Sequence, residues 1–224
     1  EFSGYTTFDR LDYDRAVTGD FKPLHTGDRW GREWEYLWAR AAITIPEAAD
    51  GKRVVMRLNL GGESSVFVNG EEFGARRNDW VRDEIHRVSD LTLAKCAKAG
   101  DTYDLVMEAY AGHTDTGCDY GPVLPGSYKP RDPQELRTSI GDSSIGIWNE
   151  TAYQLYMDVK VIWEAVNAMT DDSLRYQDLW QGLKDFTNIV DFEVEEAERD
   201  AAYAAARERL APLFECHNGS TAPQ

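Results

Sequence analysis

The chain has 224 residues, 42% of them hydrophobic, which is enough for one large domain or two small ones with their own cores. Its 40 Asp and Glu outnumber 24 Lys and Arg, and the net charge of −16 argues against nucleic acid or anionic membranes as partners. No apolar run could span a bilayer, and 3 widely spaced cysteines without a CxxC pair favour a cytoplasmic location.

Residues 1–29 carry scattered aromatic side chains among acids and show no sustained period. We expect an irregular lead-in with one short helix, packed on the domain that follows. A tryptophan-rich stretch then leads into a predicted strand from Leu37 to Ile45. Pro46 ends this strand because proline has no N–H to give to a β-ladder.

The stretch from Arg53 to Gly74 gives the clearest sheet signal. Apolar residues alternate with polar ones on both sides of Gly61-Gly62, which predicts two half-buried strands. Asn69-Gly70 favours a type I′ turn, because both central residues of that turn need a positive φ. Phe73 is therefore expected on a third strand, folded back on the second.

Two further strands are predicted, one over residues 85–93 and one after Gly100-Asp101, where Tyr103, Leu105 and Met107 alternate with other residues. About seven short strands with frequent turn signals fit two packed antiparallel sheets better than a βαβ arrangement. The sequence therefore predicts an antiparallel β-sandwich over residues 30–112.

Residues 113–144 are rich in Gly, Pro, Asp and Ser and are expected to form a connection with little regular structure. From Trp148 to Met169, apolar residues then recur at steps of three and four, the period of an amphipathic helix.

Two more helices are expected after that one. Ser173 is a candidate N-cap for the second. The third, over residues 193–210, has acids in its first turn and Arg207 and Arg209 in its last, as the helix dipole favours. Residues 145–216 are thus predicted to be an antiparallel helical unit, and residues 217–224 a linker toward a catalytic domain outside this chain.

Neither a catalytic nor a metal site is predicted. The 4 histidines are remote from one another in the sequence, and the triplet His113-Thr114-Asp115 offers two ligands, fewer than a zinc site needs. No serine lies in a G-x-S-x-G turn, and no cysteine has a histidine arranged to activate it. With 40 acidic residues, a chance pair of carboxylates is expected, so their abundance does not indicate a glycosidase centre.

With catalysis and metal binding not predicted, ligand binding at the protein surface is the remaining candidate function. Trp30, Trp34 and Trp80 are candidates to stack on sugar rings, because an aromatic ring offers a flat apolar face to sugar C–H groups. Polar residues near the third tryptophan are candidate hydrogen-bond partners of sugar hydroxyls: Arg76, Asn78 and Asp79. The alternative is that these tryptophans fill the core or a domain interface.

The first half of the chain resembles the galactose-binding-type jelly-roll domain that precedes the catalytic domain of many glycoside hydrolases. The landmarks of the resemblance, in chain order, are Trp38-Ala39-Arg40, Thr44-Ile45-Pro46, Gly51-Lys52, the segments 53–58 and 62–74, and the strand after Gly100-Asp101. Family 2 β-galactosidases and β-mannosidases share a similar order, so this half alone does not select a family.

The second half resembles the helical segment that joins the N-terminal β-domain to the catalytic barrel in family 38 α-mannosidases. The resemblance rests on residues 150–169, Leu174-Arg175 and the stretches 206–212 and 216–223. It implies that the chain is a non-catalytic N-terminal fragment of an enzyme that hydrolyses terminal α-mannosides. The aspartate nucleophile and the zinc ion of such enzymes would lie in the catalytic domain, and the fragment itself is expected to need no cofactor.

The partners that this resemblance implies are the enzyme's own catalytic domain, carbohydrate as a candidate ligand, and further copies in a homo-oligomeric parent. Three alternatives stay open. The chain could be a free-standing carbohydrate-binding module, the N-terminal domain of an enzyme similar to family 2 β-galactosidases, or an interaction adaptor that uses its acidic helices.

Overall fold

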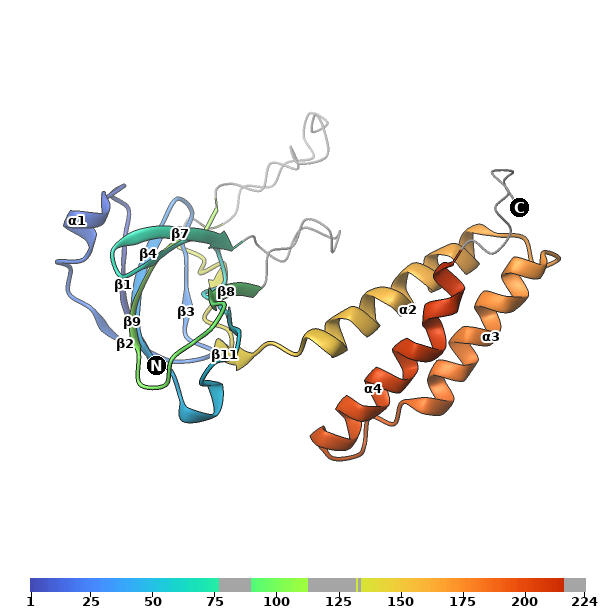
Figure 1. The fold of residues 1–224 in the computed structure, drawn as a ribbon. Coiled ribbons are helices and arrows are strands. Elements are labelled where there is room, and N and C mark those ends of the chain that lie inside the picture. The colour runs from blue at the N-terminus through green and yellow to red at the C-terminus, as the bar shows by residue number, and fades with distance from the viewer. Residues whose placement is uncertain (77–89, 113–131, 133, 216–224) are drawn as a thin grey trace, which may run out of the picture. The chain divides into compact units, whose positions relative to one another are not determined.

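The computed structural model describes residues 1–76, 90–112, 132 and 134–215 (Figure 1). The chain divides into two compact units, Glu1–Trp148 and Asn149–Gln224.

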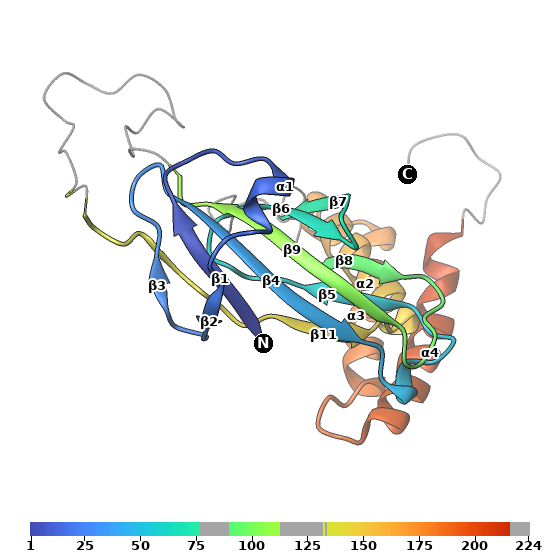
Figure 2. The ribbon, with the colours of Figure 1, turned by 90° about the vertical axis from the view of Figure 1, so that its left-hand side faces the viewer.

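Within the described residues, the first unit forms three antiparallel sheets. The six-stranded sheet has the order β2 (Lys22–Leu24), β1 (Phe2–Thr7), β4 (Tyr36–Thr44), β9 (Thr102–Tyr110), β6 (Glu63–Val68) and β7 (Glu71–Arg76). The three-stranded sheet has the order β11 (Ser144–Ile147), β5 (Val54–Arg57) and β8 (Asp90–Ala94), and the two-stranded sheet pairs β10 (Thr138–Ser139) with β3 (Arg29–Trp30). Figure 2 shows β1, β4 and β9 running side by side.

The main core contains one face of the six-stranded sheet and one face of the three-stranded sheet. Alternate residues of β4 and β9, such as Leu37 and Met107, are buried together with Met56 of β5 and Leu93 of β8. Side chains on opposite faces of a strand alternate with period two, so this burial pattern is that of a β-sandwich. The predicted fold class, a jelly-roll-like sandwich followed by about three helices, is confirmed.

The predicted hairpin is confirmed in detail. Asn69 and Gly70 have φ values of 52° and 84°, as a type I′ turn requires. Strand β7 pairs with β6, and the register shifts between Val66 and Phe67, where Phe73 is the extra residue of a bulge. Strands β5 and β6 belong to different sheets, so the glycine pair Gly61-Gly62 lies where the chain passes from one sheet to the other.

The lead-in is more regular than predicted. Residues Phe2–Thr7 form β1, which pairs with β4 inside the six-stranded sheet, and the short helix α1 (Tyr13–Ala16) follows. Ala16 packs with Trp38 and Val106 on the outer face of the same sheet. The expected packing on the sandwich is therefore present, but the segment supplies strands that its sequence pattern does not reveal.

The boundary between the units also lies later than residue 112. Strand β10 pairs with β3, and β11 pairs with β5, so the end of the segment predicted as a connection is part of the sandwich. The division at Trp148 places residues 145–148 in the first unit as well. Residues 113–131 lie outside the described part of the chain.

The second unit contains three long helices, as predicted: α2 (Glu150–Ala168), α3 (Leu174–Ile189) and α4 (Glu196–Leu210). The Ser173 hydroxyl accepts a hydrogen bond from the Tyr176 N–H at 3.0 Å, which confirms the expected N-cap. The Asn149 side chain caps α2 in the same way.

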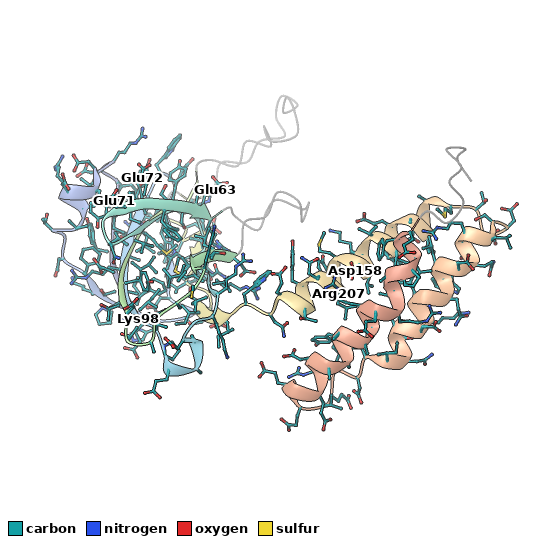
Figure 3. The ribbon with its side chains drawn as sticks, in the orientation of Figure 1. Glu63, Glu71, Glu72, Lys98, Asp158 and Arg207 are labelled. Atoms are coloured by element: carbon teal, nitrogen blue, oxygen red, sulfur yellow. The ribbon has the colours of Figure 1, made fainter. Side chains whose placement is uncertain are left out.

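Leucine, isoleucine and valine residues from all three helices or their ends form the core of this second unit, among them Leu155, Ile162, Leu179 and Leu210. Arg207 of α4 also donates to Asp158 of α2 at 2.8 Å (Figure 3). None of the helices in the described residues is long and apolar enough to cross a membrane.

Candidate functional site

The three tryptophans predicted to bind sugar have different positions. Trp30 is only 5% exposed and its indole N–H donates to the Leu60 carbonyl oxygen at 2.6 Å, so it belongs to the core and offers no ring face to a ligand. Trp34 is 58% exposed. Trp80 lies outside the described residues, together with Asn78 and Asp79.

Arg76, the remaining predicted hydrogen-bond partner, lies at the end of β7 and is buried. Its guanidinium donates to the Gly62 carbonyl oxygen at 3.3 Å, which ties β7 to the crossover between the sheets. This hydrogen bond gives Arg76 a structural role at the end of β7.

An aromatic group lies at the end of the six-stranded sheet where β4 begins and β9 ends. The ring centroids of Trp34 and Tyr110 are 6.4 Å apart, and those of Tyr36 and Tyr110 are 5.0 Å apart. Tyr36 and Tyr110 face each other across the β4–β9 ladder. We call Trp34, Tyr36 and Tyr110, with Glu33 and Arg137 beside them, the Trp34 cluster.

The electrostatics of this cluster centre on Tyr110. Burial raises the pKa of the Tyr110 hydroxyl, and nearby Tyr36 and Glu33 raise it further, whereas the Arg137 guanidinium lowers it. Sequence reasoning did not predict Glu33, Tyr110 or Arg137 as members of a site, because they come from three separate segments.

A second exposed surface lies on the helical unit. Trp163 on α2 is 50% exposed and lies 6.3 Å from Trp180 on α3, which in turn stacks on Tyr176 at 6.3 Å. Tyr156, about two helical turns before Trp163 on α2, is 51% exposed, and the Lys160 ammonium lies over its ring. We call these five residues the α2–α3 aromatic surface.

The heptad-like pattern could have identified part of this surface. The apolar residues from Trp148 to Met169 that define the predicted buried face do not include Tyr156 or Trp163. Large aromatic residues outside the buried stripe of a helix are candidates for contact with another body.

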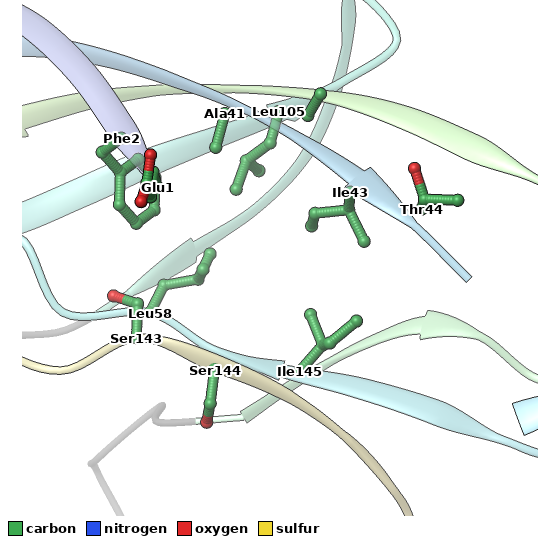
Figure 4. Close-up of a pocket in the computed structure, with 11 residues that line it drawn as sticks. Glu1, Phe2, Ala41, Ile43, Thr44, Leu58, Leu105, Ser143, Ser144 and Ile145 are labelled. Carbon is green, nitrogen blue, oxygen red and sulfur yellow. The ribbon is translucent and has the colours of Figure 1, made fainter. Parts of the chain in front are cut away.

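A cavity of about 240 Å³ opens at one edge of the sandwich (Figure 4). Phe2, Ile43 and Leu105 of the six-stranded sheet line one side of it, and Leu58 and Ile145 line the other. The lining is mostly apolar and includes one carboxylate, that of Glu1.

Within the described residues, no three His, Cys, Asp or Glu side chains lie close enough together to hold a metal ion. The triplet His113-Thr114-Asp115 lies outside this part of the chain. Cys96 is an exposed free thiol.

Comparison with known proteins gives consistent matches. The family described as "Alpha-mannosidase, jelly roll domain" matches residues 3–136. Alpha-mannosidase 2C1 of Mus musculus is 22% identical over 221 residues, which make up 98% of this chain and 20% of the mouse protein. Alpha-mannosidase 2C1 of Homo sapiens is 41% identical over 69 residues, or 31% of this chain and 7% of the human protein. The chain thus spans about a fifth of the length of the mouse relative.

Among solved structures, beta-glucuronidase 2 of Bacteroides uniformis is similar to this chain with a TM-score of 0.41 and 13% identity. The similarity covers 65% of this chain and 17% of that one.

Proposed function

This chain belongs to the family of alpha-mannosidase jelly roll domains, and we propose that it is the non-catalytic N-terminal part of an enzyme that hydrolyses terminal α-mannosides. In this proposal the sandwich and the helical unit support a separate catalytic domain of the glycoside hydrolase family 38 type. The match of the family to residues 3–136 and the similarity of 221 residues to a fifth of the mouse alpha-mannosidase support it.

The observation that carries the proposal is the α2–α3 aromatic surface. A helical unit of this size gains stability by burying its aromatic side chains, yet Tyr156 and Trp163 are 51% and 50% exposed. Clustered exposed aromatic residues mark surfaces that contact another protein body, because tryptophan and tyrosine contribute much of the binding energy at interfaces. We assign this surface to contact with the catalytic domain.

In this proposal the chemistry of glycoside hydrolysis belongs to the catalytic domain. Catalysis of glycoside hydrolysis requires two carboxyl groups facing one cavity. The cavity in Figure 4 has a single carboxylate in its lining. The proposal likewise assigns any zinc site of the enzyme to the catalytic domain.

The interface can be tested by expressing the catalytic part of the parent enzyme as a separate chain and measuring its binding to this chain by calorimetry. Trp163→Ala should weaken the complex by about 30-fold or more, the effect of losing an interface residue worth at least about 2 kcal/mol. Trp34→Ala is the matched control, because Trp34 is also exposed but lies on the other unit.

Circular dichroism of both variants verifies that the helices are intact. Equal affinities for the unmodified chain and the Trp163→Ala variant would show that the α2–α3 aromatic surface does not contact the catalytic domain.

A further inference from the structure

The backbone at Trp34 holds an aromatic ring out from the sandwich in a strained conformation. Its φ of 69° lies in the left-handed region, which a bulky residue rarely adopts. Such a conformation costs about 1 to 3 kcal/mol and persists only where the surroundings enforce it. Residues with such a strained backbone are concentrated at ligand sites, so the ring of Trp34 is a candidate ligand-binding group.

Hydrogen bonds on both sides fix this turn. The Trp34 N–H donates to the Gly112 carbonyl oxygen at 3.0 Å, and the Ala111 N–H donates to the Glu35 carbonyl oxygen at 3.0 Å. The buried Glu35 carboxylate accepts from the Arg32 N–H at 2.8 Å. The ring of Trp34 is therefore presented by a braced turn, which lowers the entropy lost when a ligand binds to it.

The residue before Trp34 in the chain, Glu33, carries a buried carboxylate oxygen. Oε1 of Glu33 is shielded from solvent and has no hydrogen-bond partner among the described residues. A buried acceptor left in this state costs free energy, and a hydroxyl donor that is admitted by rotation of the Glu33 side chain would recover it. The tyrosine hydroxyls of Tyr36 and Tyr110 and the Arg137 guanidinium add donors to the same cluster.

An exposed indole ring together with a buried carboxylate favours one class of ligand. A purely apolar molecule would leave the Glu33 oxygen without a partner, and an anion would be repelled by that carboxylate and by the net charge of −16. A sugar ring offers an apolar C–H face to an indole and hydroxyl groups that both donate and accept hydrogen bonds.

We propose that the Trp34 cluster binds a neutral pyranose, with the ring of Trp34 against one sugar face and Glu33 accepting a hydroxyl hydrogen bond. Of the tryptophans predicted to bind sugar, the structure thus selects Trp34, and it adds Glu33, Tyr110 and Arg137, which the sequence did not indicate. The site lies within the first unit, so the proposal holds whether or not the α2–α3 aromatic surface meets a catalytic domain.

The test is a nuclear magnetic resonance titration of the ¹⁵N-labelled chain with methyl α-D-mannopyranoside, followed at the indole N–H signals of its 7 tryptophans. The Trp34→Phe variant identifies the signal of Trp34. We expect that signal to shift saturably with a Kd of about 1 mM, the affinity usual for a ligand of about a dozen non-hydrogen atoms. The Trp163 signal should not move.

Variants separate the roles of the two residues. Trp34→Ala should weaken binding about tenfold or more, because it removes the stacking surface. Glu33→Gln should weaken it by several-fold, since hydrogen bonds to a charged acceptor are about twice as strong as neutral ones. Trp163→Ala, an exposed tryptophan on the other unit, should leave the Kd unchanged.

Thermal unfolding gives a second readout for Glu33. If Glu33 serves a ligand, Glu33→Ala should leave the unliganded chain as stable as before or more stable, because it removes an unpaired buried oxygen. Loss of stability in that variant would indicate a structural role instead.

Two results would overturn the proposal. One is the absence of any saturable shift at Trp34 with methyl α-D-mannopyranoside, methyl β-D-glucopyranoside and methyl β-D-galactopyranoside. The other is binding that persists unchanged in Trp34→Ala. A response to one of the other two glycosides in place of the mannoside supports the site and defines its preference.

Discussion

Replacing Trp30 by phenylalanine tests whether this tryptophan is a core residue, as the structure shows, or a sugar platform, as its sequence context allowed. Trp30 is 5% exposed, and its indole N–H donates to the carbonyl oxygen of Leu60, a residue with no exposed surface. Phenylalanine cannot donate this hydrogen bond, so a buried carbonyl oxygen loses a partner at a cost of about 1 to 3 kcal/mol. The smaller ring leaves a cavity that adds about 1 kcal/mol.

The total expected loss is about 2 to 4 kcal/mol, a large share of the 5 to 15 kcal/mol typical of a domain. With an m-value of about 2 kcal/mol per molar urea, the unfolding midpoint of the first unit should fall by about 1 to 2 M. Near-ultraviolet circular dichroism follows the tryptophans, and the data are fitted with separate transitions because the chain has two units.

The matched control is Trp34→Phe, the same chemical change four residues away at an exposed ring. Its effect should stay within about 0.5 kcal/mol, as for most surface substitutions. If both variants shift the midpoint equally, or Trp30→Phe does not shift it, the structural assignment of Trp30 is wrong.

Three further predictions concern stability. Gly61→Ala should destabilise the chain by more than about 3 kcal/mol in thermal unfolding, because the φ of Gly61 is 91° and a Cβ would lie 2.1 Å and 2.4 Å from oxygen atoms of β10. Gly27→Ala is the control: Gly27 has a φ of 94° and open space around it, so this substitution should cost only about 1 kcal/mol. Burial raises the pKa of the Glu108 carboxyl, so its contribution to stability is full at acidic pH and is lost as pH rises through the folded-state pKa. Glu108→Gln should therefore raise the urea midpoint at pH 7 and leave it nearly unchanged at pH values below about 4; an equal effect at both would contradict the burial argument. Arg207→Ala should cost about 0.5 to 1 kcal/mol through loss of the partly exposed pair with Asp158, and Asp158→Ala should add nothing further in the double variant.

Local chemistry made several elements predictable. The turn at Asn69-Gly70 follows from the two residue types that tolerate positive φ, and the start of α3 follows from the hydroxyl of Ser173. The helices follow from apolar residues at steps of three and four, which must face the same side of a helix.

Long-range pairing was not predictable in the same way. Strand β1 is held by β4, about thirty residues later in the chain, and its own sequence, Phe2-Ser3-Gly4-Tyr5-Thr6-Thr7, contains a glycine and polar residues that do not specify a strand. Strands β10 and β11 are short and lie in a segment whose composition favours loops, so only their partners in the sandwich define them.

The candidate site shows the same division. Trp30 and Trp34 are four residues apart in the stretch Trp30-Gly31-Arg32-Glu33-Trp34, yet one is buried and the other exposed. A turn with positive φ at Gly31 and Trp34 separates them, and composition alone does not reveal which ring enters the core. The neighbours of Trp34 come from β9 and from the segment before β10, so their convergence depends on the folded sheet.

The most direct test of the central claim is the hydrolysis of p-nitrophenyl α-D-mannopyranoside by the purified 224-residue chain, with and without added zinc. The account predicts a rate equal to that of buffer under both conditions, because it assigns the two carboxyl groups that glycoside hydrolysis requires to a separate catalytic domain. Turnover by this chain alone, above that of buffer and dependent on its concentration, would contradict the claim that it is the non-catalytic part of an α-mannosidase.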